Sequence, residues 1–219
     1  MNTAQLRTMP LIGPAAAILD AARQLHSDRD RFALLLEGDP GIGKTHLSDQ
    51  LAAEISGSPF AVEQINGQSL GIELVRQWRA AAGYGNLFSS FSVKRIDELD
   101  QASSQSMAEL LTYLDYLPPG TFVIATTNEY GRLRAMCKGR LETRFIRFRV
   151  DAPSVEEVSS MLVQRFKLPI ATARTIARGA VPDGCLQSVG CNVRAAINDA
   201  IGYNAARKAM NSHRKAVAA

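Results

Sequence analysis

Residues 37–47 read Glu-Gly-Asp-Pro-Gly-Ile-Gly-Lys-Thr-His-Leu and follow directly on the apolar run 32–36. This stretch satisfies the phosphate-loop pattern G-x-x-x-x-G-K-[ST]. The fixed positions of the pattern are Gly38, Gly43, Lys44 and Thr45. The confirming context is also present, because a strand-like run precedes the loop and a segment with helical spacing follows it. The stretch therefore predicts a strand, a glycine-rich turn and a helix that together bind phosphate.

The chemistry of such a loop divides between backbone and side chains. Backbone N–H groups of the turn and of the helix N-terminus point at one place and form an anion site. We expect Lys44 to reach the terminal phosphates of a nucleotide as a point charge, and the Thr45 hydroxyl to be one ligand of Mg²⁺. ATP and Mg²⁺ are the expected cofactors. The expected nucleotide contacts of the loop are Gly38, Asp39, Pro40, Gly41, Ile42, Gly43, Lys44 and Thr45.

Size and composition are those of an ordinary globular protein. The chain has 219 residues, of which 46% are hydrophobic and 21% are charged, enough for one domain with a smaller one attached. No apolar run approaches the roughly 18 residues of a membrane span, and the N-terminus has no signal-peptide pattern. We therefore expect a cytoplasmic protein with no membrane partner. Cys137, Cys185 and Cys191 lack the spacing of a zinc site or a disulfide framework.

The net charge of +4 is unevenly distributed. Residues 1–150 hold 16 lysines and arginines against 16 acids, whereas residues 151–219 hold 9 against 5. Within the first part, one stretch is basic apart from Glu142. Its basic residues are Arg132, Arg134, Lys138, Arg140, Arg144, Arg147 and Arg149. Such a surface is compatible with contact to the phosphate of a nucleic acid or of a neighbouring subunit's nucleotide, and equally with a solvated face.

Apolar spacing predicts strands that alternate with helices up to residue 150. Such alternation indicates a mainly parallel sheet that helices cover on both faces. Beyond a boundary near Asp151 we find only helical segments, near 154–166, 169–178 and 192–208. The predicted fold is therefore α/β: a P-loop parallel-sheet core over residues 1–151, with a small all-helical lid over residues 152–219.

Residues 91–100 predict an imperfect strand that finishes on two adjacent carboxylates, where it meets a loop. Because successive strand residues point opposite ways, Asp97 can face the metal while Glu98 faces the attacking water. An ordinary acidic loop is the alternative. Lys94 and Arg95 are unexpected inside a buried strand. Asn128 ends the next strand, where its amide can reach the same water or the γ-phosphate, although asparagine is also common in caps and turns.

Together these segments resemble an AAA+ ATPase, and within that superfamily they are most similar to the ATPase subunits of sliding-clamp loaders and to branch-migration motors. Residues 38–45 match the first nucleotide motif (Walker A), Ile-Asp-Glu-Leu-Asp at 96–100 the second (Walker B), and Ala-Thr-Thr-Asn at 125–128 the first sensor. The resemblance begins at Leu11-Ile12-Gly13, which implies that Leu11 and Ile12 also contact the nucleotide.

The resemblance also implies roles for arginines. Residues 139–145 are similar to the segment that ends in the arginine finger of a neighbouring subunit, which points to Arg144 and leaves Arg140 as an alternative. Residues 190–197 are similar to the second sensor, which points to Arg194. A cation opening a helix is unfavourable against the dipole, so an anionic partner would explain Arg194. A finger supplied in trans implies a homo-oligomer, either a ring or a helical filament.

The expected function is ATP hydrolysis coupled to remodelling of DNA or of a DNA-bound complex, in replication, recombination or a mobile element. Residues 65–76 resemble a clamp-loader segment near DNA, and we expect residues 67–76 to follow the phosphate backbone. One alternative is a protein-remodelling chaperone, and another is a slow nucleotide-gated scaffold that recruits a protein partner. The loop at 66–71 lacks the aromatic residue of protein-threading relatives.

Overall fold

The structure is a computed structural model that describes residues 10–81, 89–182 and 190–217. The chain divides into two compact units. One comprises Ala15–Asp39 and Lys44–Val150, and we call it the sheet unit. The other comprises the chain up to Pro14, Pro40–Gly43 and the chain from Asp151 on, and we call it the helical unit. The tip of the phosphate loop thus groups with the C-terminal helices.

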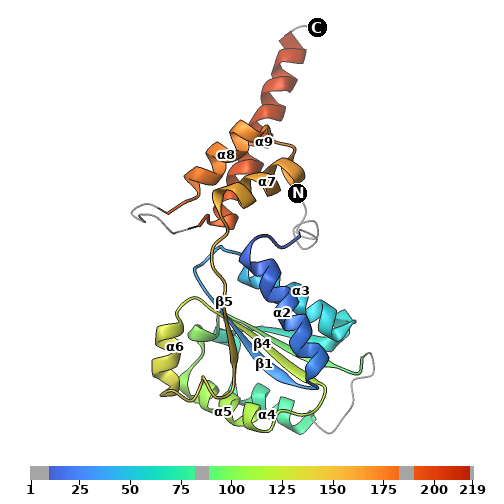
Figure 1. Ribbon diagram of the computed structural model, residues 1–219, viewed down its shortest axis with the longest axis vertical. Coiled ribbons are helices and arrows are strands. Elements are labelled where there is room, and N and C mark those ends of the chain that lie inside the picture. Colours follow the sequence, from blue (N-terminus) through green and yellow to red (C-terminus); the bar gives the residue numbers. More distant parts are fainter. Residues whose placement is uncertain (1–9, 82–88, 183–189, 218–219) are drawn as a thin grey trace. The chain divides into compact units, whose positions relative to one another are not determined.

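A parallel sheet forms the centre of the sheet unit (Figure 1). Its strands are β1 (Phe32–Glu37), β2 (Val62–Asn66), β3 (Ser92–Asp97), β4 (Thr121–Thr127) and β5 (Ile146–Arg149). Among the described residues the strand order is β2-β3-β4-β1-β5, and every pairing is parallel. All carboxyl ends therefore lie along one edge, where ligands of open parallel sheets bind.

Register brings the predicted polar residues to that edge. Glu37 at the end of β1 pairs with Thr127 at the end of β4. Ile96 of β3 pairs with Ala125 of β4, so Asp97 follows at the same level as Thr126. The loop after β1 and the acidic end of β3 consequently flank β4, with only that strand between them.

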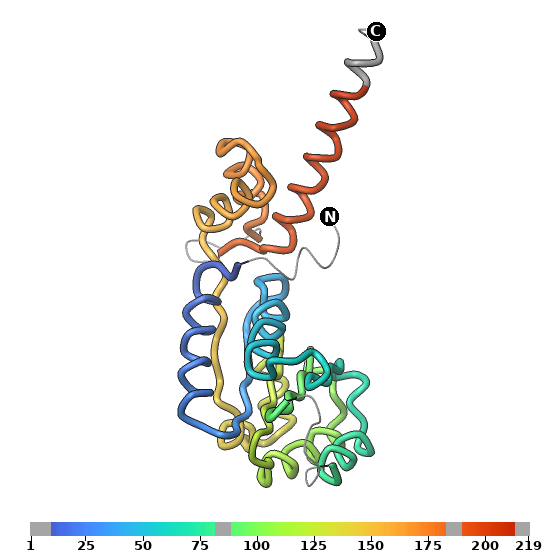
Figure 2. The backbone as a smooth tube through the Cα atoms, turned by 90° about the vertical axis from the view of Figure 1, so that its right-hand side faces the viewer, coloured from blue at the N-terminus to red at the C-terminus, as the bar shows by residue number. Residues whose placement is uncertain are grey.

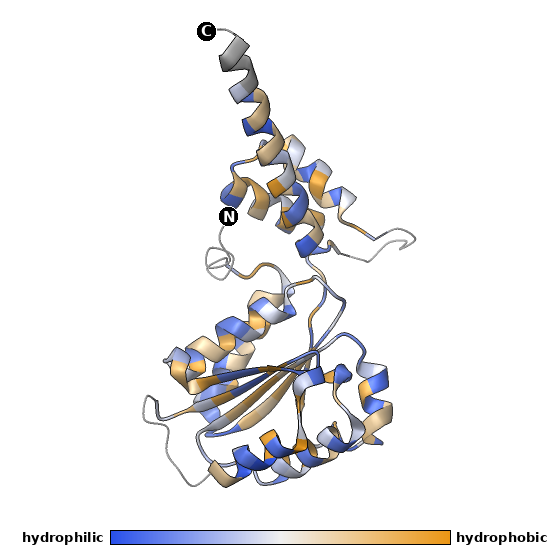
Figure 3. Ribbon diagram, turned by 180° about the vertical axis from the view of Figure 1, so that it is seen from behind, coloured by the Kyte–Doolittle hydropathy of each residue, from blue (hydrophilic) through white to orange (hydrophobic). Residues whose placement is uncertain are grey.

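Helices cover both faces of the sheet, as Figure 1 shows and as Figure 3 shows from behind. On one face lie α2 (Pro14–Asp28) and α3 (Lys44–Ser56); on the other lie α4 (Ile72–Ala80), α5 (Ser104–Asp115) and α6 (Tyr130–Cys137). Short 3-10 turns are η1 (Pro59–Ala61), η2 (Gly67–Ser69) and η4 (Leu99–Gln101). Leu35 of β1 and Val123 of β4 pack with Trp78 of α4 and Leu110 of α5 in one buried cluster. Strands buried on both faces explain the continuous apolar runs of β1 and β4.

Three helices form the helical unit: α7 (Val155–Phe166), α8 (Ile170–Gly179) and α9 (Val193–Val217). A capping box starts α7, because the Ser154 side chain accepts from the Glu157 N–H while the Glu157 carboxylate accepts from the Ser154 N–H. Small residues allow close packing of the helices, with Ala173, Ala177 and Ala196 fully buried. The C-terminal part of α9 extends beyond α7 and α8 (Figure 2).

The predicted α/β class, the parallel sheet and the helical segments are confirmed. Two details of the prediction were wrong. Helix α6 was not predicted, and α9 continues to Val217 although its pattern was assigned only to residue 208. Cys137 and Cys191 are free and buried, while Cys185 lies outside the described residues. Within the described ranges, no helix has the length and apolar character that crossing a membrane requires.

Candidate nucleotide site

The phosphate loop connects the end of β1 at Glu37 to the start of α3 at Lys44. All three of its glycines have a positive φ, 153° at Gly38, 84° at Gly41 and 108° at Gly43. Residues with a Cβ rarely adopt these values, which explains why the loop has glycine at these positions. The turn ends at the N-terminus of a 13-residue helix, whose unpaired N–H groups and dipole favour an anion at this position.

Lys44 folds back over this loop. Its Nζ donates to the carbonyl of Gly38 at 2.8 Å and to that of Asp39 at 2.7 Å, and the side chain is buried. Thr45 follows in the first turn of α3 and is exposed. A buried ammonium and an exposed hydroxyl, adjacent to a cluster of backbone N–H groups, match the parts that hold a triphosphate and its metal.

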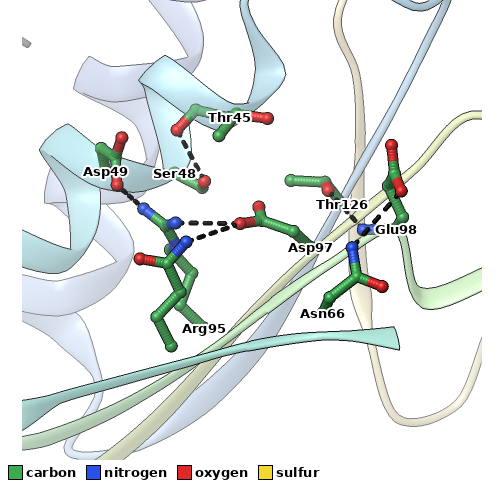
Figure 4. Close-up of polar contacts among 9 residues, drawn as sticks. Thr45, Ser48, Asp49, Asn66, Arg95, Asp97, Glu98 and Thr126 are labelled. Carbon is green, nitrogen blue, oxygen red and sulfur yellow. Dashed lines mark hydrogen bonds and ion pairs between the residues drawn. The ribbon is translucent and has the colours of Figure 1, made fainter. Parts of the chain in front are cut away.

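The two carboxylate oxygens of Asp97, at the end of β3, have different hydrogen-bond environments (Figure 4). Oδ2 accepts from Arg95 Nη2 at 2.9 Å and from Gln64 Nε2 at 3.1 Å. Oδ1 is buried and has no hydrogen-bond partner within the described part of the chain. A buried carboxylate oxygen without a partner is costly, and an oxygen ligand of this kind suits Mg²⁺. The residues present therefore fit the expected metal, for which Thr45 and Asp97 are the predicted protein ligands.

The two basic residues inside β3 now have an explanation. Arg95 is only 2% exposed and forms ion pairs with Asp49 of α3 and with Asp97. Lys94 points to the other face, where it pairs with Glu63 at 2.7 Å and lies over the ring of Trp78. Each of the two cations thus meets a carboxylate from another element, which spacing along the chain does not reveal.

Glu98 takes a left-handed conformation with φ 54° and ψ 54°. Its N–H donates to Thr126 Oγ1 at 3.1 Å, and its Oε2 accepts from Asn66 Nδ2 at 3.4 Å. A non-glycine residue in this region is uncommon and often marks a functional site. Sequence reasoning missed Asn66 and Thr126 as partners of Glu98. Their positions at strand ends were the only available signal.

A buried carboxylate organises the end of β4. Asp100 is 1% exposed, and its Oδ1 accepts from Thr127 Oγ1 at 2.7 Å and from the Asn128 N–H at 3.0 Å. These bonds fix the backbone at Asn128, whose side chain is partly exposed. Asp100, the last residue of the match to the second nucleotide motif, thus supports the predicted first sensor.

Arg194 lies in the first turn of α9 and its side chain is exposed. Within the helical unit, its N–H donates to the Gly41 carbonyl at 3.1 Å, and Asn192 Nδ2 donates to the Pro40 carbonyl at 3.2 Å. The start of α9 therefore lies beside the tip of the phosphate loop. In the same unit, Ile12 packs against the helical core, next to the partly buried Leu11.

Arg144 is held inside its own chain. Its Nη2 donates to Asp115 Oδ2 at 2.9 Å, its Nε lies 2.8 Å from Asp115 Oδ1, and its Nη1 donates to the Arg140 carbonyl at 2.9 Å. The hydrogen bond from Arg144 lowers the pKa of Asp115 below the ordinary carboxyl value. The Arg140 side chain is exposed. Other arginines of the basic stretch also have acidic partners: Arg132 with Glu129, Arg134 with Glu142, and Arg147 with Glu37.

Comparison with known proteins gives a family and a fold. The model of the ATPase family associated with various cellular activities (AAA) matches residues 34–149. No curated protein sequence matches the chain. Among solved structures, the RuvB Holliday junction branch migration motor of Thermotoga maritima is 23% identical with a TM-score of 0.62, covering 80% of this chain and 60% of RuvB.

A second similar structure is a DNA polymerase III gamma-subunit-related protein, also from Thermotoga maritima. It is 15% identical with a TM-score of 0.56, and the match covers 81% of this chain and 69% of that protein. At these identities the likeness shows a shared fold. The chain spans about 60% of the length of RuvB, so it matches part of that motor.

Proposed function

The chain belongs to the AAA family of ATPases, and from this premise we propose that it binds ATP with Mg²⁺ and hydrolyses it. One observation carries the proposal. Lys44 and Thr45 come after β1, Asp97 ends β3 and Glu98 follows it, and both pairs lie at the carboxyl edge of one parallel sheet. This arrangement supplies phosphate binding, a metal ligand and a carboxylate for water at a single edge.

Each residue has a distinct task in this proposal. Lys44 exchanges the carbonyls of Gly38 and Asp39 for phosphate oxygens, which form stronger charge-assisted hydrogen bonds. When bound, Mg²⁺ would neutralise the charge that develops on the phosphates. Thr45 of α3 and Asp97 of β3 would hold it.

Glu98 orients the attacking water and accepts its proton, and Asn66 and Thr126 hold Glu98 in place. Asn128 contributes its amide to the same water or to the γ-phosphate. Arg194 reads the γ-phosphate from the start of α9. We retain the functional division into a core over residues 1–151 and a lid over residues 152–219, with Leu11 and Ile12 beside the nucleotide.

Replacing Glu98 tests hydrolysis separately from binding. Glu98→Gln keeps the size of the side chain and its contact with Asn66 but removes the base, so turnover should fall about 10²- to 10⁴-fold while ATP affinity stays near that of the wild type. Phosphate release and equilibrium binding of a fluorescent ATP analogue measure the two quantities. An unchanged turnover rate would remove Glu98 from the mechanism and favour a slow nucleotide-gated scaffold.

We further propose that hydrolysis requires assembly into a ring or filament, because an arginine from a neighbouring copy completes the site. Arg144 would have to leave Asp115 to serve this purpose, whereas Arg140 is exposed next to it. We therefore favour Arg140 as the trans-acting residue and assign Arg144 to holding the backbone of its loop. Such an arginine accelerates hydrolysis by about 10³- to 10⁵-fold in phosphoryl-transfer enzymes.

Mixing two inactive variants tests this arrangement. Glu98→Gln has a damaged active site but an intact Arg140. Arg140→Ala has an intact active site but lacks the arginine that a neighbouring copy would receive. If the arginine acts in trans, the mixture regains turnover that neither variant shows alone. If the arginine acts within its own chain, the mixture stays inactive at every ratio. Arg144→Ala in place of Arg140→Ala identifies which of the two residues is responsible.

DNA is the substrate that we propose for the resulting motion. The support is the DNA role printed for both similar proteins, together with the excess of basic residues after residue 150. Within residues 67–76, Arg76 pairs with Glu73 at 2.8 Å, which reduces the positive charge that this segment offers to DNA. Fluorescence anisotropy with duplex and single-stranded DNA, in the presence of an ATP analogue, should show binding that weakens with salt. Absence of such binding would favour the remodelling of a protein partner.

A further inference from the structure

β3 carries a buried arginine two residues before the predicted metal ligand Asp97. Arg95 is 2% exposed. A guanidinium in such a place is tolerated only when it is paired and hydrogen-bonded. Its partners therefore decide what the residue does.

These partners come from two elements. One side of the guanidinium pairs with Asp49 of α3, and Nη2 donates to Asp97 Oδ2 at 2.9 Å (Figure 4). Gln64 of β2 donates to the same Asp97 oxygen at 3.1 Å. Oδ2 is thus occupied by two donors, while Oδ1 has no hydrogen-bond partner among the described residues.

The contact between Arg95 and Asp49 joins the strand to the helix that follows the phosphate loop. Asp49 lies four residues after Thr45 on α3, so both side chains occupy the same face of the helix, one turn apart. Arg95 therefore connects β3, which ends in Asp97, to the helix that begins with Lys44 and Thr45. A planar guanidinium can bridge two carboxylates in this way, whereas the single ammonium group of a lysine cannot hold both in a fixed geometry.

We propose that Arg95 is a positioning residue for the metal site. It orients Asp97 so that Oδ1 remains available to Mg²⁺, and it sets the separation between Asp97 and Thr45 through Asp49. This inference rests on the proposed function and adds a residue that the ATPase motifs do not contain. The positive charge of Arg95 also prevents Asp49 and Asp97 from repelling each other across the site.

Partners of metal ligands commonly change metal affinity by about 10- to 100-fold when they are lost. Arg95→Lys keeps the charge but loses the bridge. The Mg²⁺ concentration that half-saturates the tightening of ATP binding should therefore rise about tenfold. Binding of the analogue in EDTA should change less than twofold, because the phosphate loop itself is untouched. Asp49→Asn keeps one hydrogen bond and should give a smaller shift in the same direction.

Lys94 offers a matched control. It occupies the same strand and pairs with Glu63 in a similar way, but it points to the opposite face and does not contact Asp97. Lys94→Gln should lower stability without moving the Mg²⁺ midpoint. Each variant is measured as the full chain with a fluorescent ATP analogue, first in EDTA and then during Mg²⁺ titration, with urea unfolding measured in parallel.

The outcomes separate the two claims. A raised Mg²⁺ midpoint in Arg95→Lys and in Asp49→Asn, with Lys94→Gln unchanged, supports the positioning role. If Arg95→Lys does not fold, the Mg²⁺ midpoint of Asp49→Asn alone tests the positioning role. This inference alone is overturned if the wild type binds the nucleotide normally and the Mg²⁺ midpoints of the variants are not shifted. It is also overturned if the variants lose the same factor of ATP affinity in EDTA and in Mg²⁺. A wild type that binds no nucleotide overturns the proposed function as well.

Discussion

Gly67 is the residue whose enlargement should disturb Glu98 most directly. It begins η2, and a Cβ added there would lie 2.2 Å from the Glu98 carbonyl oxygen and 3.0 Å from the Glu98 carbonyl carbon. Both neighbours are backbone atoms, so no flexible side chain can move aside. The substitution Gly67→Ala must therefore shift either the loop after β2 or the backbone of Glu98.

The size of the effect follows from these distances. Ordinary van der Waals contact, at 3.4–4 Å, requires a separation more than 1 Å greater than the 2.2 Å available. Overpacking of this kind costs roughly 1–3 kcal/mol of folding free energy. A displacement of about 1 Å at a reacting group can lower turnover about 10²-fold. We expect turnover to fall by this order while ATP affinity changes little, because the phosphate loop lies at the end of a different strand.

Single-turnover phosphate release measures the chemical step, and equilibrium binding of an ATP analogue measures the affinity. Gly71→Ala is the matched control, because it lies in the same loop and a Cβ there meets nothing within 4 Å. The control should behave as the wild type. A Gly67→Ala protein with wild-type turnover, or one that loses affinity and turnover equally, would refute the coupling between this glycine and Glu98.

Three further predictions concern single contacts. Asp115→Asn removes the partner of Arg144. Because that contact lowers the pKa of Asp115 in the folded state, its contribution to folding stability is full at neutral pH. The stability difference between the variant and the wild type should therefore close in thermal melts as the pH falls below about 4. Asn192→Ala removes the cap of α9 and the bond to the Pro40 carbonyl, so urea unfolding should show a loss of about 1 kcal/mol, and a stability equal to the wild type would argue against the cap. Ser154→Ala breaks the capping box of α7 and should cost about 1 kcal/mol with no change in ATP affinity; a weakened affinity would contradict this separation.

The fold was predictable because its strongest signals are local. β1 and β4 are continuous apolar runs, and the loop after β1 has a pattern that only a phosphate site commonly requires. Helix α6 gave no such signal. Only Leu133 and Cys137 of its eight residues are buried, and its arginines conceal the helical period. Its position depends on packing against the sheet, which short-range pattern does not encode.

The supporting contacts of the site were beyond sequence reasoning for a similar reason. Arg95 meets Asp49 from a helix 46 positions earlier in the chain, and Asn66 meets Glu98 across 32 positions. Both contacts depend on the tertiary arrangement, because β2 and β3 are neighbours in the sheet and α3 packs on the same sheet. The motifs predicted which residues could act on a nucleotide, whereas the fold revealed which residues hold them.

Equilibrium titration of the purified chain with ATP, in the presence of Mg²⁺, tests the central claim most directly. We expect saturable ATP binding by the wild type, in which the ammonium group of Lys44 contacts the phosphate loop. The Lys44→Ala variant lacks this group and should show a large loss of ATP affinity. Thermal unfolding of both proteins without nucleotide shows whether the variant remains folded. A folded wild-type chain that takes up no ATP, or a Lys44→Ala variant that binds ATP as tightly as the wild type, would contradict it.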